Sequence, residues 1–206
     1  MARAEIERWD LRYNTPTYVF GKAVNAFLQR EAVRLEASSR ILAVADGEGR
    51  NGVWLAEQGH QVCSIDGSRV AQDKARALAE ERGVRVQLVE ADLLEWTWPQ
   101  ASFDAVVAIF IQFARPDERQ RLFAHMKSAL RPGGLLFLQG YGLAQLQHRT
   151  GGPSAAEQLY TLDLLRRDFA DFDILLLREY EAHIEEGAGH AGTSALIDLV
   201  ARRPRS

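Results

Sequence analysis

The chain has 206 residues, of which 47% are hydrophobic and 26% charged, so it can bury one sizeable core. This balance excludes the disordered and collagenous classes, and a formal net charge of −3 gives no overall field that would attract a nucleic acid backbone. The single cysteine, Cys63, excludes an internal disulfide and a cysteine-rich metal site. We therefore expect one domain, with no nucleic acid partner and no metal.

Hydropathy along the chain indicates whether the protein could span a membrane. The first ten residues, MARAEIERWD, are mostly polar, and the longest apolar run covers only residues 105–111. A membrane-spanning helix needs about 20 apolar residues. We expect a cytoplasmic protein without a membrane partner, and the sequence leaves monomer and homodimer open.

The first 38 residues contain an aromatic-rich leader, IERWDLRYNTPTYVFG, followed by a helical pattern at residues 24–37. The leader carries Trp9, Tyr13, Tyr18 and Phe20, which are costly to leave in water. We expect this leader to close over a ligand site, although packing against the core is an equally good reading for Tyr18.

Short apolar runs and longer amphipathic segments then alternate. The strand-like runs cover residues 40–45, 60–66, 84–90, 103–110 and 134–139. The helical patterns cover residues 51–58, 68–83 and 116–130. Such alternation predicts right-handed crossovers and a Rossmann-like, doubly wound sheet of five parallel strands with helices on both faces.

The last third departs from this rhythm. A helix is expected at residues 161–169, and two strand-like runs follow at residues 172–184 and 193–203, joined by the glycine-bearing stretch EEGAGHAG. Two strands joined by a short loop form an antiparallel hairpin. The predicted fold is therefore an α/β sheet of seven strands that ends in this hairpin.

The loop after the first strand, ADGEGRNG, contains the pattern G-x-G-x-x-G at Gly47, Gly49 and Gly52. Glycines let the backbone turn tightly against a ligand, and the following helix offers free N–H groups. Asp66, at the end of the second strand, can accept both hydroxyls of a ribose. The pattern alone also fits a plain tight turn, but strand, helix and acid together favour an adenosine-bearing ligand.

Two such ligands compete for the loop. Asp46 and Glu48 flank Gly47, and these carboxylates would repel the diphosphate of a nicotinamide cofactor. They would favour the cationic head and the sulfonium of S-adenosylmethionine. The acids therefore favour S-adenosylmethionine over NAD or NADP.

The motifs ILAVADGEGRNGVWLA, VCSIDGS, VEADLLEW, FDAVVAIF and LRPGGLLFLQGY resemble, in order, those of class I S-adenosylmethionine-dependent methyltransferases. The leader and the tail are similar to the small bacterial group around the tellurite-resistance methyltransferase and, more distantly, thiopurine methyltransferase. The resemblance implies methyl transfer to a small-molecule acceptor, such as a thiol or a selenium or tellurium species, with S-adenosylhomocysteine as product. The alternatives are a non-catalytic S-adenosylmethionine or nucleotide sensor and, less favoured, an NAD(P)-dependent oxidoreductase.

The same resemblance implies the residues that bind the cofactor. They are Ala45, Asp46, Gly47, Glu48, Gly49, Asp66, Gly67, Ser68, Asp92, Leu93, Ile109 and Phe110. Asp92 would accept from the adenine amino group, with a helix N-cap as its alternative role. Three positions depart from the family pattern: Ala43 replaces an acid, Ala45 a glycine and Gly67 a bulky aliphatic residue.

Acceptor-pocket candidates come from the leader and from the loops after the last strands. They are Tyr18, Gln112, Tyr141 and His190, with Trp9, Tyr13, Phe20 and His148 as further wall residues. A solvated loop position is the alternative for His190. No residue is assigned as a general base.

The resemblance also divides the single domain, residues 1–206, into functional parts. Residues 1–38 form the lid and its helix, residues 39–140 the cofactor-binding core, and residues 141–206 the acceptor-side loop, helix and terminal hairpin.

Overall fold

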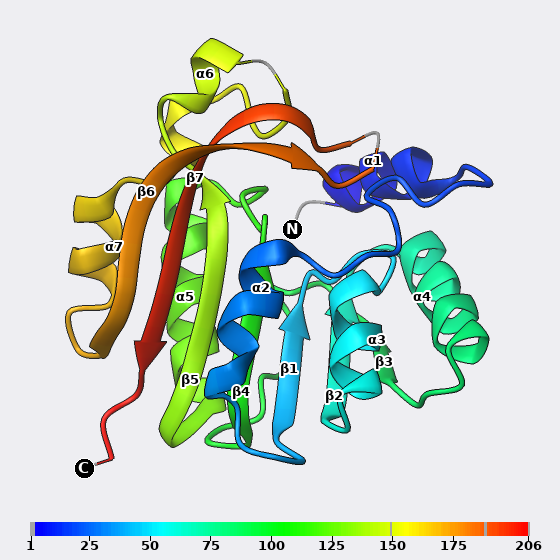
Figure 1. The fold of residues 1–206 in the computed structure, drawn as a ribbon, viewed down its shortest axis with the longest axis horizontal. Helices are drawn as coiled ribbons and strands as arrows, with labels where there is room; N and C mark the ends of the chain where they lie inside the picture. Colours follow the sequence, from blue (N-terminus) through cyan, green and yellow to red (C-terminus); the bar gives the residue numbers. More distant parts are fainter. Residues whose placement is uncertain (1–2, 149, 188, 206) are drawn as a thin grey trace.

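The fold is described from a computed structural model that covers residues 3–148, 150–187 and 189–205. Its sheet has seven strands in the order β3-β2-β1-β4-β5-β7-β6 (Figure 1). The strands are β1 Arg40–Val44, β2 Gln61–Asp66, β3 Gln87–Glu90, β4 Phe103–Ile109, β5 Leu130–Tyr141, β6 Asp173–Glu185 and β7 Ala191–Arg202. The first five are parallel, and β7 runs antiparallel to both β5 and β6, which confirms the predicted class.

Helices cover both faces of this sheet. They are α1 Arg3–Tyr13, α2 Ala26–Glu31, α3 Arg50–Glu57, α4 Arg69–Glu81, α5 Pro116–Ala129, α6 Gln145–His148 and α7 Leu162–Asp168, with 3₁₀ turns at Ala32–Arg34 and Ala156–Gln158. The expected start of α4 is confirmed, because the Ser68 hydroxyl accepts the Ala71 N–H at 3.1 Å.

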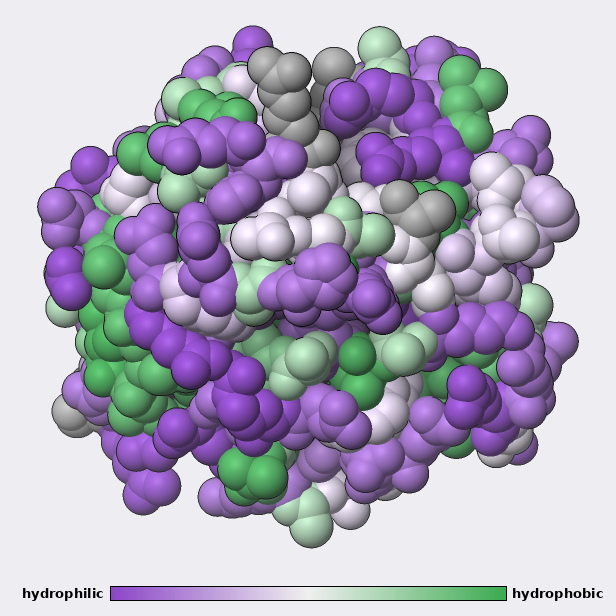
Figure 2. Space-filling model, turned by 45° about the horizontal axis from the view of Figure 1, so that its top comes forward, coloured by the Kyte–Doolittle hydropathy of each residue, from purple (hydrophilic) through white to green (hydrophobic). Residues whose placement is uncertain are grey.

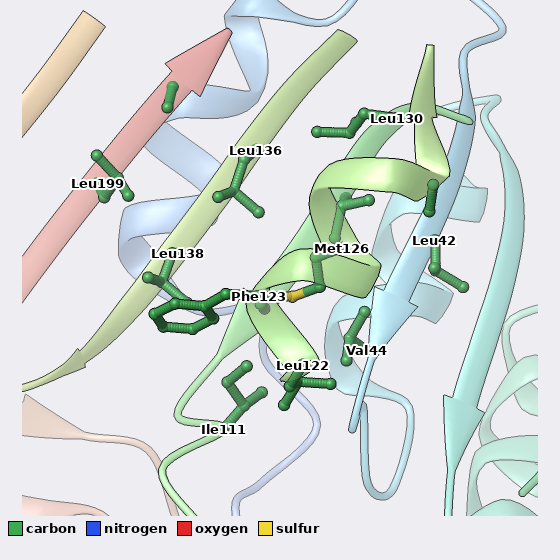
Figure 3. Packing of buried hydrophobic residues seen from close by; sticks show 14 of the residues in the cluster. Leu42, Val44, Ile111, Leu122, Phe123, Met126, Leu130, Leu136, Leu138 and Leu199 are labelled. Atoms are coloured by element: carbon green, nitrogen blue, oxygen red, sulfur yellow. The ribbon is translucent and has the colours of Figure 1, made fainter. Parts of the chain in front are cut away.

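The two halves of the core follow the strand period of two. In β1, Ile41 and Ala43 pack on the side of α2 and α3, whereas Leu42 and Val44 face the opposite side. Figure 3 shows that opposite side, where side chains of α5 lie against those of β1, β5 and β7. Continuous apolar strands buried on both faces are the reason that a parallel sheet forms here.

Several predicted boundaries were wrong. The helix expected at residues 24–37 begins only after Asn25, whose side chain accepts the Leu28 N–H, and it tightens into a 3₁₀ turn that ends at an extended Leu35. The third strand starts at Gln87 because the Val84 N–H still bonds to the end of α4. The segment RPGG belongs to β5, which starts at Leu130 paired with Phe103 and continues past an irregularity in register. Helix α1 in the leader was not predicted.

The topology fixes where a ligand can bind. Strands β1 and β4 are neighbours, and the chain leaves them toward opposite sides of the sheet. Open α/β sheets bind ligands at the carboxyl ends of strands at such a switch point. The β6–β7 hairpin arches over this end toward α1, and the Gly189 N–H donates to Val19 O at 3.0 Å (Figure 1).

Candidate functional site

A cavity opens at the switch point, with about 790 Å³ of free space counted to its open mouth. Its lining residues are Trp9, Tyr13, Phe20, Gly21, Val44, Ala45, Asp46, Gly47, Glu48, Arg50, Asn51, Asp66, Val107, Ile109, Phe110, Phe113 and His190. The leader, the loop after β1, the ends of β2 and β4, and the hairpin therefore meet at one place. Eight of the expected cofactor-binding residues touch or adjoin it, namely Ala45, Asp46, Gly47, Glu48, Gly49, Asp66, Ile109 and Phe110.

The backbone conformation of the loop after β1 explains why glycines occupy two of its positions. Gly47 and Gly49 have φ angles of +57° and +84°, which L residues with side chains rarely adopt. A Cβ at Gly49 would lie 2.7 Å from Ala75 Cβ, and one at Gly47 would lie 2.7 Å from Tyr13 Oη. Ala45 also has a positive φ, +49°, at the position where the resembled family carries glycine. The backbone strain is thus concentrated at the cavity.

Asp66 holds this loop in place. Asp66 is 8% exposed; its Oδ2 accepts the Gly47 N–H at 2.9 Å and its Oδ1 accepts the Ser68 N–H at 2.8 Å. Burial raises its pKa to about 6. A carboxylate oxygen has two lone pairs, so each oxygen can still accept a ligand hydroxyl.

Asp46 is the second buried acid at the cavity. Its Oδ2 accepts the Ser64 hydroxyl at 3.0 Å and the Gly52 N–H at 3.1 Å. Burial raises its pKa to about 7, and no cationic side chain of the described residues lies within 4.0 Å of it. Two buried carboxyl groups beside a cavity suit a ligand that brings positive charge, as an amino acid head and a sulfonium would.

Glu48, unlike Asp46, is already paired with a cationic side chain. It is 3% exposed, pairs with Lys74 of α4, and accepts the Phe20 N–H at 3.3 Å. Although Glu48 lines the cavity, its charge already serves to attach the leader to α4. Asp46 is therefore the acid of this loop that remains without a cation among the described residues.

The expected adenine-side residues lie outside the lining of this cavity. Asp92 Oδ1 accepts the Leu94 N–H at 2.9 Å within a turn that no helix follows, so the alternative N-cap role is wrong, and Leu93 is fully buried in the core. Ser68 caps α4 and donates its hydroxyl to Asp10 Oδ1 of α1 at 2.5 Å. The cofactor roles of Gly67, Ser68, Asp92 and Leu93 stay predictions.

Aromatic rings roof the cavity. Trp9 and Tyr13 are stacked with centroids 5.5 Å apart, and Phe20 lies 6.2 Å from Tyr13. On the far side, the His190 ring lies 4.4 Å from both Phe20 and Phe110. The leader thus meets the end of β4 and the hairpin through ring contacts.

A second cavity adjoins the first behind these rings. It is lined by Arg8, Trp9, Arg12, Phe20, Phe110, Gln112, Phe113, Tyr141, Gly152, Pro153, Ser154, Gln158 and His190. Trp9, Phe20, Phe110, Phe113 and His190 line both cavities. The shared residues form a wall with one compartment on each side.

The acceptor-pocket candidates divide into two groups. His190, Tyr141 and Gln112 line the second cavity, whereas Tyr18 donates to Lys74 O at 2.9 Å and packs on α3 and α4. His148 bonds to Glu181 at 2.8 Å, outside both cavities. Tyr18 and His148 therefore have structural contacts instead of a place in either cavity.

His190 is the titratable side chain of the shared wall. It is 7% exposed, its Nδ1 lies 3.8 Å from Glu186 Oε2, and burial lowers its pKa, so the imidazole is neutral at pH 7. Tyr141 is 1% exposed, and its hydroxyl has no hydrogen-bond partner among the described residues. Burial raises the pKa of Tyr141, which keeps the phenol protonated. Gln112 uses its amide to bond both backbone groups of Tyr141.

A buried polar network that was not predicted from the sequence lies beneath the hairpin tip. Glu186 accepts from Arg50 at 2.6 Å and from Asn25 at 2.8 Å. Burial alone would raise the pKa of Glu186, but His190 and Arg50 outweigh it and lower the pKa to about 2. These partners are 136 and 161 residues apart in the chain, so no local pattern could have indicated them.

Comparison with known proteins agrees with this geometry. Residues 41–134 match the family described as "Methyltransferase domain". This match, together with the methyltransferase relatives below, supports a class I S-adenosylmethionine-dependent methyltransferase. The chain is 30% identical over 115 residues to glycine/sarcosine N-methyltransferase of Halorhodospira halochloris, and 34% identical over 113 residues to demethylmenaquinone methyltransferase of Thermus thermophilus. Each match covers 52% of this chain but only 42% and 51%, respectively, of the relative, so the chain spans about half their length.

Solved structures share the fold of this chain over nearly its whole length. One comes from work on the conversion of a disulfide bond into a thioacetal group during echinomycin biosynthesis. It superimposes with a TM-score of 0.80 at 19% identity and covers 98% of this chain and 92% of that one. At this identity the likeness shows the fold.

Within residues 3–148, 150–187 and 189–205, no three His, Cys, Asp or Glu side chains gather in a way that could hold a metal ion. No helix in the same ranges has both the length and the apolar character to cross a membrane.

Asp66→Ala is expected to weaken S-adenosylhomocysteine binding by roughly ten- to hundredfold, because a hydrogen bond to a charged group contributes about 1.5–3 kcal/mol. Calorimetric titration measures the loss. Glu90→Ala is the matched control, since Glu90 is the exposed register partner of Asp66 on β3. Unchanged affinity in a folded Asp66→Ala protein would contradict the ribose assignment.

Asp46→Asn is expected to stabilise the ligand-free protein at pH 8 but not at pH 4. The folded state raises the pKa of Asp46 to about 7, so it holds a proton that the unfolded chain releases above pH 4. Stability contributed by this group therefore falls as pH rises from about 4 to 7, by roughly 2–4 kcal/mol. Thermal unfolding at both pH values measures the difference, with the exposed Asp73→Asn as control. Parallel pH curves for wild type and Asp46→Asn would refute the prediction.

Proposed function

We propose that this protein is an S-adenosylmethionine-dependent methyltransferase that acts on a small-molecule acceptor. The observation that carries the proposal is the pair of cavities with a shared aromatic wall containing His190. Methyl transfer requires two binding compartments that meet at the reacting atoms, one for the donor and one for the acceptor.

The bound cofactor would supply an electrophilic methyl group on a sulfonium. The residues of this chain would contribute binding, alignment and exclusion of water. The glycine loop lets the backbone approach the ligand, Asp46 balances a cationic head, and Asp66 accepts from ribose hydroxyls. The rings of Trp9 and Phe20 exclude water from the junction of the cavities.

We further propose that the acceptor is a soft nucleophile, such as a thiol or a selenium or tellurium species. The similarity of the leader and the tail to the tellurite-resistance and thiopurine group supports this choice. The ring-lined junction supports it too, since sulfur contacts aromatic rings favourably.

The three parts of the chain would then have separate roles. Residues 1–38 would act as a lid, residues 39–140 would bind the cofactor, and residues 141–206 would form the acceptor side. The position of α1 over the first cavity and of residues 152–154 at the second supports this division. A cytoplasmic location is proposed with it.

A non-catalytic sensor is the alternative, and the open second cavity argues against it, since a sensor needs no acceptor site. Calorimetry with S-adenosylmethionine, S-adenosylhomocysteine, NAD and NADP tests the cofactor. A screen with labelled methyl donor and thiols, selenite and tellurite then tests transfer. Tight NAD binding would overturn the cofactor assignment, and cofactor binding without transfer to any acceptor would favour the sensor.

A further inference from the structure

The two cavities differ in charge. Asp46, Glu48 and Asp66 line the first, and its one arginine, Arg50, is paired with Glu186. The second is lined by Arg8 and Arg12 and, over the described residues, by no aspartate or glutamate. A compartment with basic walls attracts an anion, whereas the first compartment attracts a cation.

Of the two arginines that line the second cavity, Arg12 is the one without an ion-pair partner among the described residues. Arg8 is paired with Glu5, but no carboxylate of the described residues lies within 4.0 Å of Arg12. The guanidinium of Arg12 instead lies 5.3 Å from the centroid of the Trp9 ring and 5.2 Å from that of Phe20. Cation–π contacts hold a guanidinium by its face and leave its N–H edge free for a ligand.

The position of Arg12 links it to the proposed reaction. Arg12 lines the second cavity but not the first, and its guanidinium lies against Trp9 and Phe20 of the shared wall. The guanidinium is therefore on the acceptor side of that wall. Figure 2, which brings the carboxyl ends of the strands forward, shows a largely hydrophilic face with scattered hydrophobic patches. A small charged molecule can reach such a face without crossing an apolar rim.

We propose that the acceptor is a small anion whose carboxylate or phosphate group is bound by Arg12, with its nucleophilic atom directed toward the shared wall. The inference rests on the proposed function, because it assigns the acceptor class of that same site. Guanidinium binds both kinds of anion through paired N–H donors. An anionic acceptor also complements a cofactor of opposite charge in the adjoining compartment.

Binding of non-reacting probes tests this inference apart from catalysis. Protein saturated with S-adenosylhomocysteine is titrated with benzoate, phenyl phosphate and the neutral isostere benzamide, and Kd is measured by calorimetry or ligand-observed NMR. We expect at least one anion to bind about tenfold more tightly than benzamide, as a charge-assisted pair implies. The stronger of the two anions identifies the preferred group.

Arg12→Gln is expected to remove this preference while leaving S-adenosylhomocysteine affinity within about twofold. Arg3→Gln is the matched control on the same helix, since Arg3 is 93% exposed, pairs with Glu7 and lines neither cavity. Equal binding of benzamide and both anions by the wild type, or an anion preference that survives in Arg12→Gln, would overturn the inference. Failure of methyl transfer with every acceptor would instead count against the proposed function, because the probe titrations do not depend on it.

Discussion

Deletion of residues 1–20 is expected to leave a folded protein that binds S-adenosylhomocysteine weakly and no longer transfers methyl groups. The two main core clusters contain no residue from this segment, so the sheet and its helices stay packed. The deletion removes Trp9, Tyr13 and Phe20, which line the first cavity and which, in the proposed lid, would exclude water from it. Circular dichroism, calorimetry and methyl-transfer rates measure the three outcomes.

A point variant separates closure from mere packing. Asp10 accepts from the Ser68 hydroxyl at 2.5 Å and the Val70 N–H at 3.3 Å, and these bonds attach α1 to α4. Asp10→Ala keeps every ring of the leader but loses this attachment, so we expect an intermediate loss of transfer. Hydrogen exchange of residues 3–20 should slow when S-adenosylhomocysteine binds. Full activity after the deletion, or exchange that ignores the ligand, would show that these aromatics only pack.

The fold could be predicted because its signals are local. Strands buried on both faces, such as residues 41–44, are continuous apolar runs in the sequence. Ser68 is a typical N-cap residue and marks the start of α4. The glycine loop and Asp66 were found for the same reason, since a strand, a turn and an acid at fixed spacing lie within one βαβ unit.

The rest of the site depends on contacts that no local pattern contains. Tyr13 and Tyr18 are both aromatic residues of the leader, and the sequence does not distinguish them. Tyr13 nevertheless lines the first cavity, whereas Tyr18 packs on α3 and α4. Glu48 is predicted to bind the cofactor and lines the cavity, but the sequence does not indicate its ion pair with Lys74 of the next helix. Helix α1 lacks an apolar stripe, so its place is apparent only from contacts outside the helix, such as the ring contacts of Trp9 and Tyr13 with Phe20 and the bond from Ser68 to Asp10.

His190→Gln is expected to slow methyl transfer to a thiol by about 10²-fold at pH 7, because the neutral imidazole would take the thiol proton. The ring lies in the wall between the cavities, with Nδ1 toward Glu186, so Nε2 is directed to the other side of the ring. The groups that face it are Glu186, Arg50, Arg12 and Tyr141. In the proposed step the thiol S–H bond would break and its proton would pass to His190, while the acceptor sulfur would form the bond to the methyl carbon. The bond between that carbon and the sulfonium sulfur of the donor would break at the same time, and S-adenosylhomocysteine would leave as a neutral thioether.

The pH dependence distinguishes proton transfer from a structural role. Above about pH 8.5 a thiol ionises without help, so the loss in His190→Gln should shrink as pH rises, with S-adenosylhomocysteine affinity unchanged within about threefold. His183→Gln is the control, since His183 is 64% exposed on β6. An equal loss at every pH would assign His190 to packing against Phe20 and Phe110. A rate that is unchanged at pH 7 would show that the thiol ionises in the cavity without His190. The guanidinium of Arg12, which lies on the acceptor side, would then favour the thiolate.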